Sequence, residues 1–279
     1  MQHRCCLIMK KHIETLSDWI ENREMRGYYT FTKDDIEKQF PSLGKDYMKT
    51  YLSRLVAKEK IISPWRNFYV IMPIEYSLKG IIPPVFYMDQ LMAYLNKRYY
   101  VALLNAAAFY GASHQKVQTF SVMVEQPGMR NTSKNGTTIL FFSKKEIRME
   151  FVRKHKTQTG YINVSSPELT AVDLIENEKS IGGLNRVCTV LNELADAMDP
   201  DGPDDSLFKI SPAPVFQRLG FILEHILDRE ELAEALYSKI EAAGLKLRKI
   251  PFKINKPTEC CEVDKKWKVI INQEIEIDE

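Results

Sequence analysis

Three helical patterns followed by two short β-prone runs occupy the first quarter of the chain, and this order constrains the fold more than any other feature. The spacing of apolar residues predicts helices over 10–24, 33–40 and 45–58. Thr32 precedes the second of these as a helix cap, and two aspartates fill its first turn, where the helix dipole favours acids. The runs 61–63 and 68–72, joined by the turn PWRN, predict a β-hairpin.

The third predicted helix has an apolar side and a basic, hydrogen-bonding outer side. Three helices and a hairpin are the order of a winged helix-turn-helix, whose third helix enters the major groove of DNA while the hairpin tip contacts the backbone or minor groove. We therefore expect contacts with double-stranded DNA from six side chains: Lys45, Lys49, Thr50, Ser53, Arg54 and Arg66. Two other interpretations stay open, namely a merely solvated polar face and a surface for protein contacts.

The stretch PIEYSLKGIIPP at 73–84 concentrates proline and glycine and predicts a connector. A chain of 279 residues is long enough for two domains. We expect a winged helix-turn-helix DNA-binding domain over 10–73 and a larger α+β domain over 84–279.

The larger domain begins with helical patterns and continues with β-like runs. A helix is expected over 85–96, and the stretch YYVALLNAAAFYGASHQ at 99–115 predicts a second, alanine-rich helix that Gly111 ends in a left-handed cap. Strands forming an antiparallel sheet are expected at 119–125, 137–142, 147–152 and 160–165.

Helices dominate the remainder of the predicted domain. In SSPELTAVDLIE, Pro167 suits the first position of a helix, and Glu168 is spaced to close a capping box with Ser165. Three further helices are predicted over GGLNRVCTVLNELADAM, SPAPVFQRLGFILEHIL and DREELAEALYSKIEAAG, and KWKVIINQEIEIDE alternates like a strand. The expected fold is an antiparallel sheet with a helical bundle.

Charge is unevenly spread along the chain. Residues 1–75, 76–160 and 161–279 carry net charges of about +3, +8 and −9, which add to the +2 of the whole chain. Arginine and lysine fall in the loops between the predicted strands, and VRKHK at 152–156 forms a dense basic edge that suits phosphates. The loop residues are Arg130, Lys134, Lys144 and Lys145.

The sequence predicts a cytoplasmic protein with reduced thiols. No apolar run reaches the eighteen or so residues of a membrane span, and no secretory leader is recognisable, so no membrane association is expected. The five cysteines include two adjacent pairs, Cys5-Cys6 and Cys260-Cys261, a spacing that suits neither ordinary disulfides nor zinc sites. The first eight residues show no helical pattern and need not belong to the native protein.

Three groups of residues are candidates for a chemical site. His114 with Glu168 and Asp173 is a conceivable acid–base or metal site, but no metal-binding spacing occurs among the five histidines. The glycines do not form a phosphate-binding loop, and Cys188 on an apolar helical stripe is better explained as a small buried residue. We expect no catalytic residue, no metal and no cofactor, and therefore not an enzyme.

Six blocks of sequence carry a family resemblance. After the stretch YLSRLVAKEKIISPWRNFYVI come YYVALLNAAAFYGASHQKVQTFSVMV, KTQTGYINVSSPELTAVDLIE, IGGLNRVCTVLNELAD, QRLGFILE and WKVIINQEIEID, in this order. From about Lys10 onward the chain resembles the AbiEi antitoxins of type IV toxin–antitoxin systems. Asn67 stands where the hairpin turn of that family usually has glycine.

The resemblance implies a function in phage defence. It implies a winged helix that binds inverted repeats in the operon's own promoter as an autoregulating transcriptional regulator, with possible self-association on the DNA. It also implies a C-terminal domain that counteracts a cognate nucleotidyltransferase-like toxin. The alternative is a stand-alone winged-helix transcriptional regulator with a ligand- or protein-sensing C-terminal domain.

Overall fold

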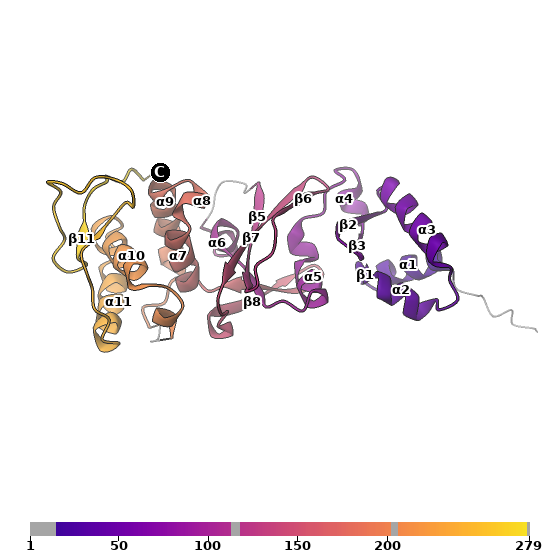
Figure 1. The fold of residues 1–279 in the computed structure, drawn as a ribbon, viewed down its shortest axis with the longest axis horizontal. Coiled ribbons are helices and arrows are strands. Elements are labelled where there is room, and N and C mark those ends of the chain that lie inside the picture. The colour runs from indigo at the N-terminus through magenta and orange to yellow at the C-terminus, as the bar shows by residue number, and fades with distance from the viewer. Residues whose placement is uncertain (1–14, 113–117, 202–205, 278–279) are drawn as a thin grey trace, which may run out of the picture. The chain divides into compact units, whose positions relative to one another are not determined.

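The computed structural model describes residues 15–112, 118–201 and 206–277. The chain divides into two compact units, Met1–Tyr94 with Lys134–Gly136, and Leu95–Ser133 with Thr137–Glu279. We call these the N-terminal unit and the C-terminal unit. Figure 1 labels their helices and strands.

The second and third helices of the N-terminal unit begin at the predicted residues, whereas the first begins at Leu16 and not at residue 10. Thr15 and Thr32 each form a capping box, in which the threonine oxygen accepts the N–H of an aspartate three residues on and the aspartate accepts in return. The first predicted helix is described only from its cap, since residues 10–14 lie outside the described part of the chain. The helices are α1 Leu16–Met25, α2 Lys33–Gln39, α3 Lys45–Ala57, α4 Ile74–Ser77 and α5 Met88–Tyr94, with a 3-10 turn at Pro84–Phe86.

An apolar core holds α1, α2 and α3 together. Trp19 packs edge-on against the rings of Phe31 and Phe40, at centroid distances of 5.7 and 6.1 Å. Met48 and Leu52 are the buried residues of α3, so its predicted apolar side is confirmed. The opposite side of α3 is left in solvent.

A three-stranded antiparallel sheet completes this unit, in the order β1-β3-β2. The strands are β1 Thr30–Thr32, β2 Ile61–Trp65 and β3 Phe68–Ile71. The predicted four-residue turn PWRN is wrong, because Pro64 and Trp65 belong to β2 and only Arg66 and Asn67 form the turn. Pro64 lacks an N–H and lies at a register irregularity, where a ladder hydrogen bond is not needed.

The C-terminal unit contains a six-stranded sheet in the order β6-β7-β5-β4-β9-β8. Its strands are β4 Tyr99–Val101, β5 Thr119–Glu125, β6 Thr132–Lys134, β7 Thr137–Lys144, β8 Val152–Thr157 and β9 Gly160–Ser165. The expectation of an antiparallel sheet is wrong in part. The β5–β7 and β4–β9 pairs are parallel, whereas β4–β5 and β8–β9 are antiparallel.

Two strand assignments differ from the sequence prediction. Residues 99–101 were expected to be helical but form a buried strand in the middle of the sheet, and the helix starts only at Leu103, whose φ is 56°. The strand expected at 147–152 is also wrong. Met149–Phe151 form a 3-10 turn, and the strand β8 begins only at Val152. The basic run 152–156 therefore belongs to β8.

The α-helices in the described part of this unit are α6 Leu103–Phe109, α7 Pro167–Glu176, α8 Glu178–Ile181, α9 Leu184–Leu194, α10 Ala213–His225 and α11 Glu230–Ala242. The predicted left-handed cap at Gly111 is confirmed, with φ 80°. Helices α6 and α7 pack on β9, while α9 and α10 pack on α7, and α11 packs on α10. No helix among the described residues is long and apolar enough to cross a membrane.

The long strand expected at the end of the chain does not form. Val269–Ile270 (β11) pairs with Ile250–Pro251 (β10), Ile270 also bridges to Val263, and residues 271–277 belong to no strand. The buried ring of Trp267 holds this region onto α10, since its Nε1 donates to Glu224 at 2.7 Å.

The ring of Trp267 leaves no room for a side chain at Gly220 in α10, because an added Cβ would overlap the ring. Gly220→Ala should therefore lower the free energy of unfolding by at least about 2 kcal/mol, despite a helix-propensity gain of about 1 kcal/mol. Urea denaturation measures this loss. As a control, Gly44→Ala faces open space and should lose no more than about 1 kcal/mol; equal losses would contradict the packing.

Candidate functional site

The outer side of α3 carries the side chains that the sequence assigned to DNA. Lys45, Lys49, Thr50, Ser53 and Arg54 are all exposed. Around the helix axis, Thr50 lies nearly opposite the buried Met48, with Lys49 on one flank and Arg54 on the other. The helix thus presents polar side chains over about half of its circumference.

A groove of about 560 Å³ runs between α3 and the hairpin. Lys45, Lys49 and Ser53 line its helix side, and Lys33 of α2 adds a third lysine. Ser63, Asn67 and Tyr69 line the hairpin side. Three predicted residues and the hairpin therefore share one basic groove.

Arg54 lies on the other flank of α3. There it lines a second groove, of about 600 Å³, together with Glu21 and Glu24 of α1 and Lys58 beyond the end of α3. Three carboxylates on this side, counting Glu59, offset the cations, whereas the hairpin-flank groove has three lysines and one carboxylate, Asp46. The hairpin flank is therefore the more favourable one for a polyanion. The six predicted residues are not gathered at one point.

Arg66 and Asn67 form the tip of the hairpin. Arg66 is exposed, and its backbone carbonyl accepts a hydrogen bond from the Tyr94 hydroxyl at 3.4 Å. Asn67 has φ 60°, in the left-handed region that glycine and asparagine adopt most readily. Asparagine can therefore adopt the turn conformation at a position where AbiEi antitoxins usually have glycine.

Sequence reasoning missed Lys33 and Tyr69. Lys33 was read only as the first residue of a helix, but its backbone N–H donates to the Asn67 carbonyl at 3.0 Å, and this bond joins α2 to the hairpin tip. Its ammonium group pairs with Glu37 at 3.3 Å. Periodicity within one element cannot reveal such a link, which arises because β1 pairs with β3.

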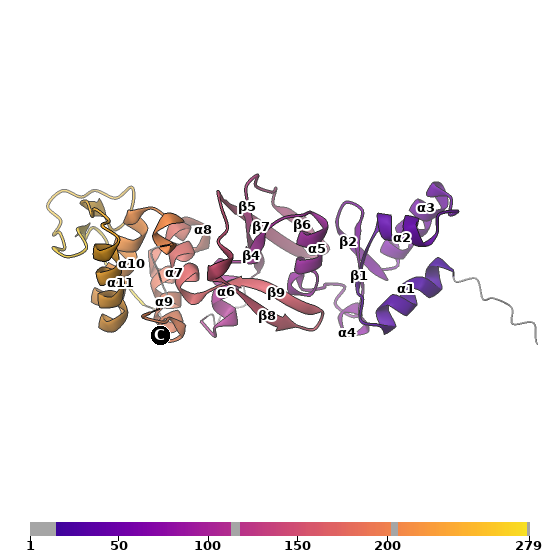
Figure 2. The same cartoon turned by 90° about the horizontal axis from the view of Figure 1, so that it is seen from below.

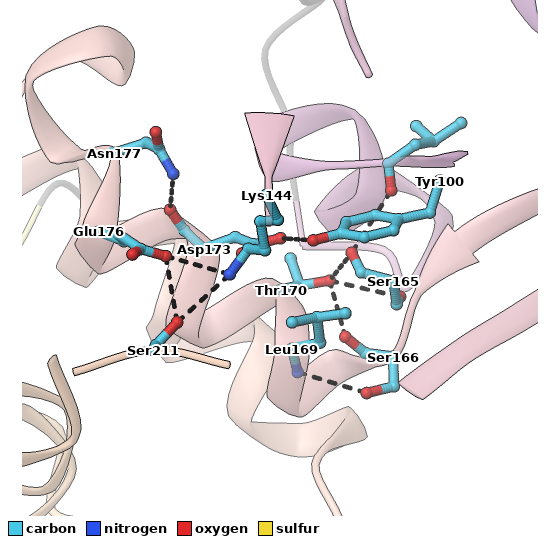
Figure 3. Close-up of polar contacts among 11 residues, drawn as sticks. Tyr100, Lys144, Ser165, Ser166, Leu169, Thr170, Asp173, Glu176, Asn177 and Ser211 are labelled. Atoms are coloured by element: carbon cyan, nitrogen blue, oxygen red, sulfur yellow. Dashed lines mark hydrogen bonds and ion pairs between the residues drawn. The ribbon is translucent and has the colours of Figure 1, made fainter. Parts of the chain in front are cut away.

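A second polar site lies inside the C-terminal unit (Figure 3). The ammonium group of Lys144, at the end of β7, lies 2.8 Å from the Asp173 carboxylate and 3.1 Å from that of Glu176, both on α7. The Tyr100 hydroxyl of β4 donates to Asp173 at 2.9 Å. The Ser211 hydroxyl donates to Glu176 at 3.1 Å. Lys144 was expected in an exposed loop, and that expectation is wrong.

Burial controls the ionisation of this cluster. It raises the pKa of the Asp173 carboxyl above its usual value, although Lys144 and Tyr100 act in the opposite direction. Burial alone would lower the pKa of Lys144, but the carboxylates of Asp173 and Glu176 outweigh it and raise that pKa. The Asp173 side chain is 0% exposed and that of Lys144 9%. Charges this enclosed hold elements together and do not meet a substrate from solvent.

The start of α7 also differs from the prediction. Ser166, and not Ser165, is the helix cap, with its hydroxyl accepting the Leu169 N–H at 3.3 Å and Pro167 in the first turn (Figure 3). Glu168 does not close a capping box with Ser165. Its carboxylate accepts the backbone N–H of Asp199 at 3.0 Å.

The remaining chemical candidates gain no support. Ser113, His114 and Gln115 lie outside the described residues, as do Cys5 and Cys6. Cys188 is buried, as predicted, and burial together with Glu178 raises the pKa of its thiol to about 12. Among the residues in the described ranges, no group of three or more His, Cys, Asp or Glu could hold a metal ion.

Comparison with known proteins identifies the class of the C-terminal unit. Residues 100–225, from β4 to the end of α10, match the family described as AbiEi antitoxin C-terminal domain. Over these residues the chain is similar to the C-terminal domain of AbiEi antitoxins, and the resemblance predicted from the sequence blocks is confirmed there. Members of this family are antitoxins of toxin–antitoxin systems and are regulatory. A comparison with curated protein sequences finds no match.

Two solved structures are similar to this chain. The crystal structure of the RV2827C protein from Mycobacterium tuberculosis has a TM-score of 0.65 over 91% of this chain and 90% of that chain, at 12% identity. That likeness shows a shared mixed α+β fold. An antigenic nucleotidyltransferase-like protein from Paracoccidioides brasiliensis matches with a TM-score of 0.38 over 56% of this chain and 91% of that chain, at 13% identity. A similarity at this level supports no conclusion.

The buried ion pair yields a stability prediction. Lys144→Met leaves the Asp173 charge buried without its cation, so the free energy of unfolding should fall by about 3 kcal/mol. Adding Asp173→Asn to this variant should recover part of the loss. Urea denaturation measures both, with the exposed neighbour Lys145 as a control, since Lys145→Met should change stability by less than about 0.5 kcal/mol. Equal effects at positions 144 and 145 would disprove the buried pair.

Proposed function

We propose that the N-terminal unit is a winged helix-turn-helix that binds double-stranded promoter DNA through α3 and the β2–β3 hairpin. The observation that carries this proposal is the groove in which Lys45, Lys49 and Ser53 of α3 face Ser63 and Asn67 of the hairpin. The phosphate backbone is the natural partner of such lysines. On this account the domain covers residues 10–73 and the antitoxin domain residues 84–279.

Each side chain has a role in the proposed complex. Lys45 and Lys49 contact phosphates on the hairpin flank, and Arg54 does so on the other flank. Thr50 and Ser53, on the outermost side of α3, reach base edges in the major groove, and Arg66 at the hairpin tip contacts the backbone or minor groove. One such unit makes few base contacts, so two protomers on two inverted half-sites supply the affinity.

The C-terminal unit is proposed to counteract a cognate nucleotidyltransferase-like toxin in the cytoplasm. The match of residues 100–225 to the AbiEi antitoxin C-terminal domain supports an antitoxin role. A reading frame for such a toxin beside the gene for this chain would support the pairing. Together the two units make an antitoxin that represses its own operon in a phage-defence system.

Mutation of α3 tests this division of labour. Lys49→Ala combined with Arg54→Ala should weaken binding to DNA from upstream of the chain's own gene at least tenfold in a mobility-shift assay. Loss of two phosphate contacts should also reduce the slope of log affinity against log salt concentration by about 2. Neutralisation of the toxin should survive this double change.

The control is Lys79→Ala, an exposed lysine in the connector, which should bind DNA like the unmodified chain. Wild-type promoter binding by the α3 double variant would show that the recognition helix is assigned wrongly. If the α3 double variant loses toxin neutralisation while its unfolding midpoint is unchanged, the assignment of DNA binding and neutralisation to separate units is wrong.

A further inference from the structure

The β8–β9 hairpin is an edge ribbon of the six-stranded sheet. β8 is the last strand, paired only with β9, and the two strands are antiparallel from the Val152–Ser165 pair to the Thr157–Gly160 pair (Figure 2). One strand of this ribbon carries the basic run VRKHK.

Strand alternation sorts the side chains of this ribbon onto two faces. Arg153 and His155 lie opposite Val164 and Ile162, which are buried, and the His155 ring lies 5.0 Å from that of Phe109 on α6. His155, Ile162 and Val164 on this face pack against the protein, while Arg153 at the same face remains exposed.

The other face is open to solvent and carries different residues. Lys154 lies opposite Asn163, and Lys156 lies opposite Tyr161. Both lysines are exposed, and Tyr161 is 58% exposed although it sits within a sheet. We call Lys154, Lys156, Tyr161 and Asn163 the outward face of the hairpin.

The cations of the outward face are not neutralised by the protein. Within the described ranges, neither Lys154 nor Lys156 forms an ion pair with a carboxylate, and Glu146 and Glu150, which precede β8 in the sequence, pair with Arg148. Lysines on an edge strand discourage unwanted strand pairing. That role accounts for the charge but not for the exposed aromatic ring beside it.

We propose that the outward face binds single-stranded nucleic acid. Lys154 and Lys156 contact consecutive phosphates, and the Tyr161 ring stacks on a base between them. Aromatic rings on strands flanked by cations are the usual platform for unpaired bases, because every base has a π-face. A base inside a duplex is already stacked between its neighbours, so duplex DNA offers no free base face to the Tyr161 ring. This site is separate from the α3 groove and does not depend on the proposed role of that groove.

Binding of a fluorescein-labelled 20-nucleotide oligouridine to the full chain tests the proposal by fluorescence anisotropy. Lys154→Gln with Lys156→Gln should weaken binding at least tenfold and reduce the log–log salt slope by about 1.4, as expected for two contacts with a single strand. Tyr161→Ser should weaken binding about tenfold, whereas Tyr161→Phe keeps the stacking ring and should stay within about twofold of the unmodified chain. An oligodeoxythymidine of equal length distinguishes RNA from DNA as the preferred strand.

Two controls separate this site from general electrostatics. Arg153→Gln removes one cation from the same strand on the opposite face and should leave affinity within about twofold. The α3 double variant, Lys49→Ala with Arg54→Ala, should bind oligouridine normally. The proposal is overturned if Tyr161→Ser binds like the unmodified chain, if Arg153→Gln weakens binding as much as the lysine pair, or if random-sequence duplex DNA competes as well as oligouridine.

Discussion

The pairing of β1 with β3 fixes where the basic helix of the N-terminal unit can lie. Thr32 ends β1 opposite Phe68 and at the same time caps α2, so the chain passes from strand to helix without a loop. The next backbone N–H, of Lys33, donates to Asn67 at the hairpin tip. The groove between α3 and the hairpin follows from this arrangement, because α2 and α3 share one core with β1.

In the C-terminal unit, a buried charge determines how the elements pack. Asp173 is fully buried, and an isolated carboxylate there would be costly, so Lys144 and Tyr100 must reach it. These two residues come from β7 and β4, and Asp173 comes from α7. The ion pair therefore specifies how the sheet meets the helices. It also explains why a basic residue can be conspicuous in sequence and yet take no part in binding.

Local rules predicted much of the fold. The caps at Thr32 and Gly111, the buried side of α3 and the apolar stripe of α9 follow from short-range pattern and capping chemistry, and the structure confirms them. The failures share a different cause. Residues 99–101 are all buried because β4 lies in the middle of the sheet. Periodicity cannot distinguish such a fully buried strand from a buried helix. The burial of Lys144 depends on a carboxylate that is distant in the sequence. The same holds for Lys33, whose place beside the hairpin depends on the pairing of two strands.

Hydrogen–deuterium exchange of the full chain, with and without a duplex from its own promoter, tests the central claim most directly. If α3 and the hairpin form the DNA interface, the duplex should slow amide exchange in residues 45–57 and 61–71. A duplex of unrelated sequence should do so less at the same salt concentration, since it offers phosphates without matching base edges. Protection confined to the C-terminal unit, with exchange in α3 and the hairpin unchanged, would contradict the account.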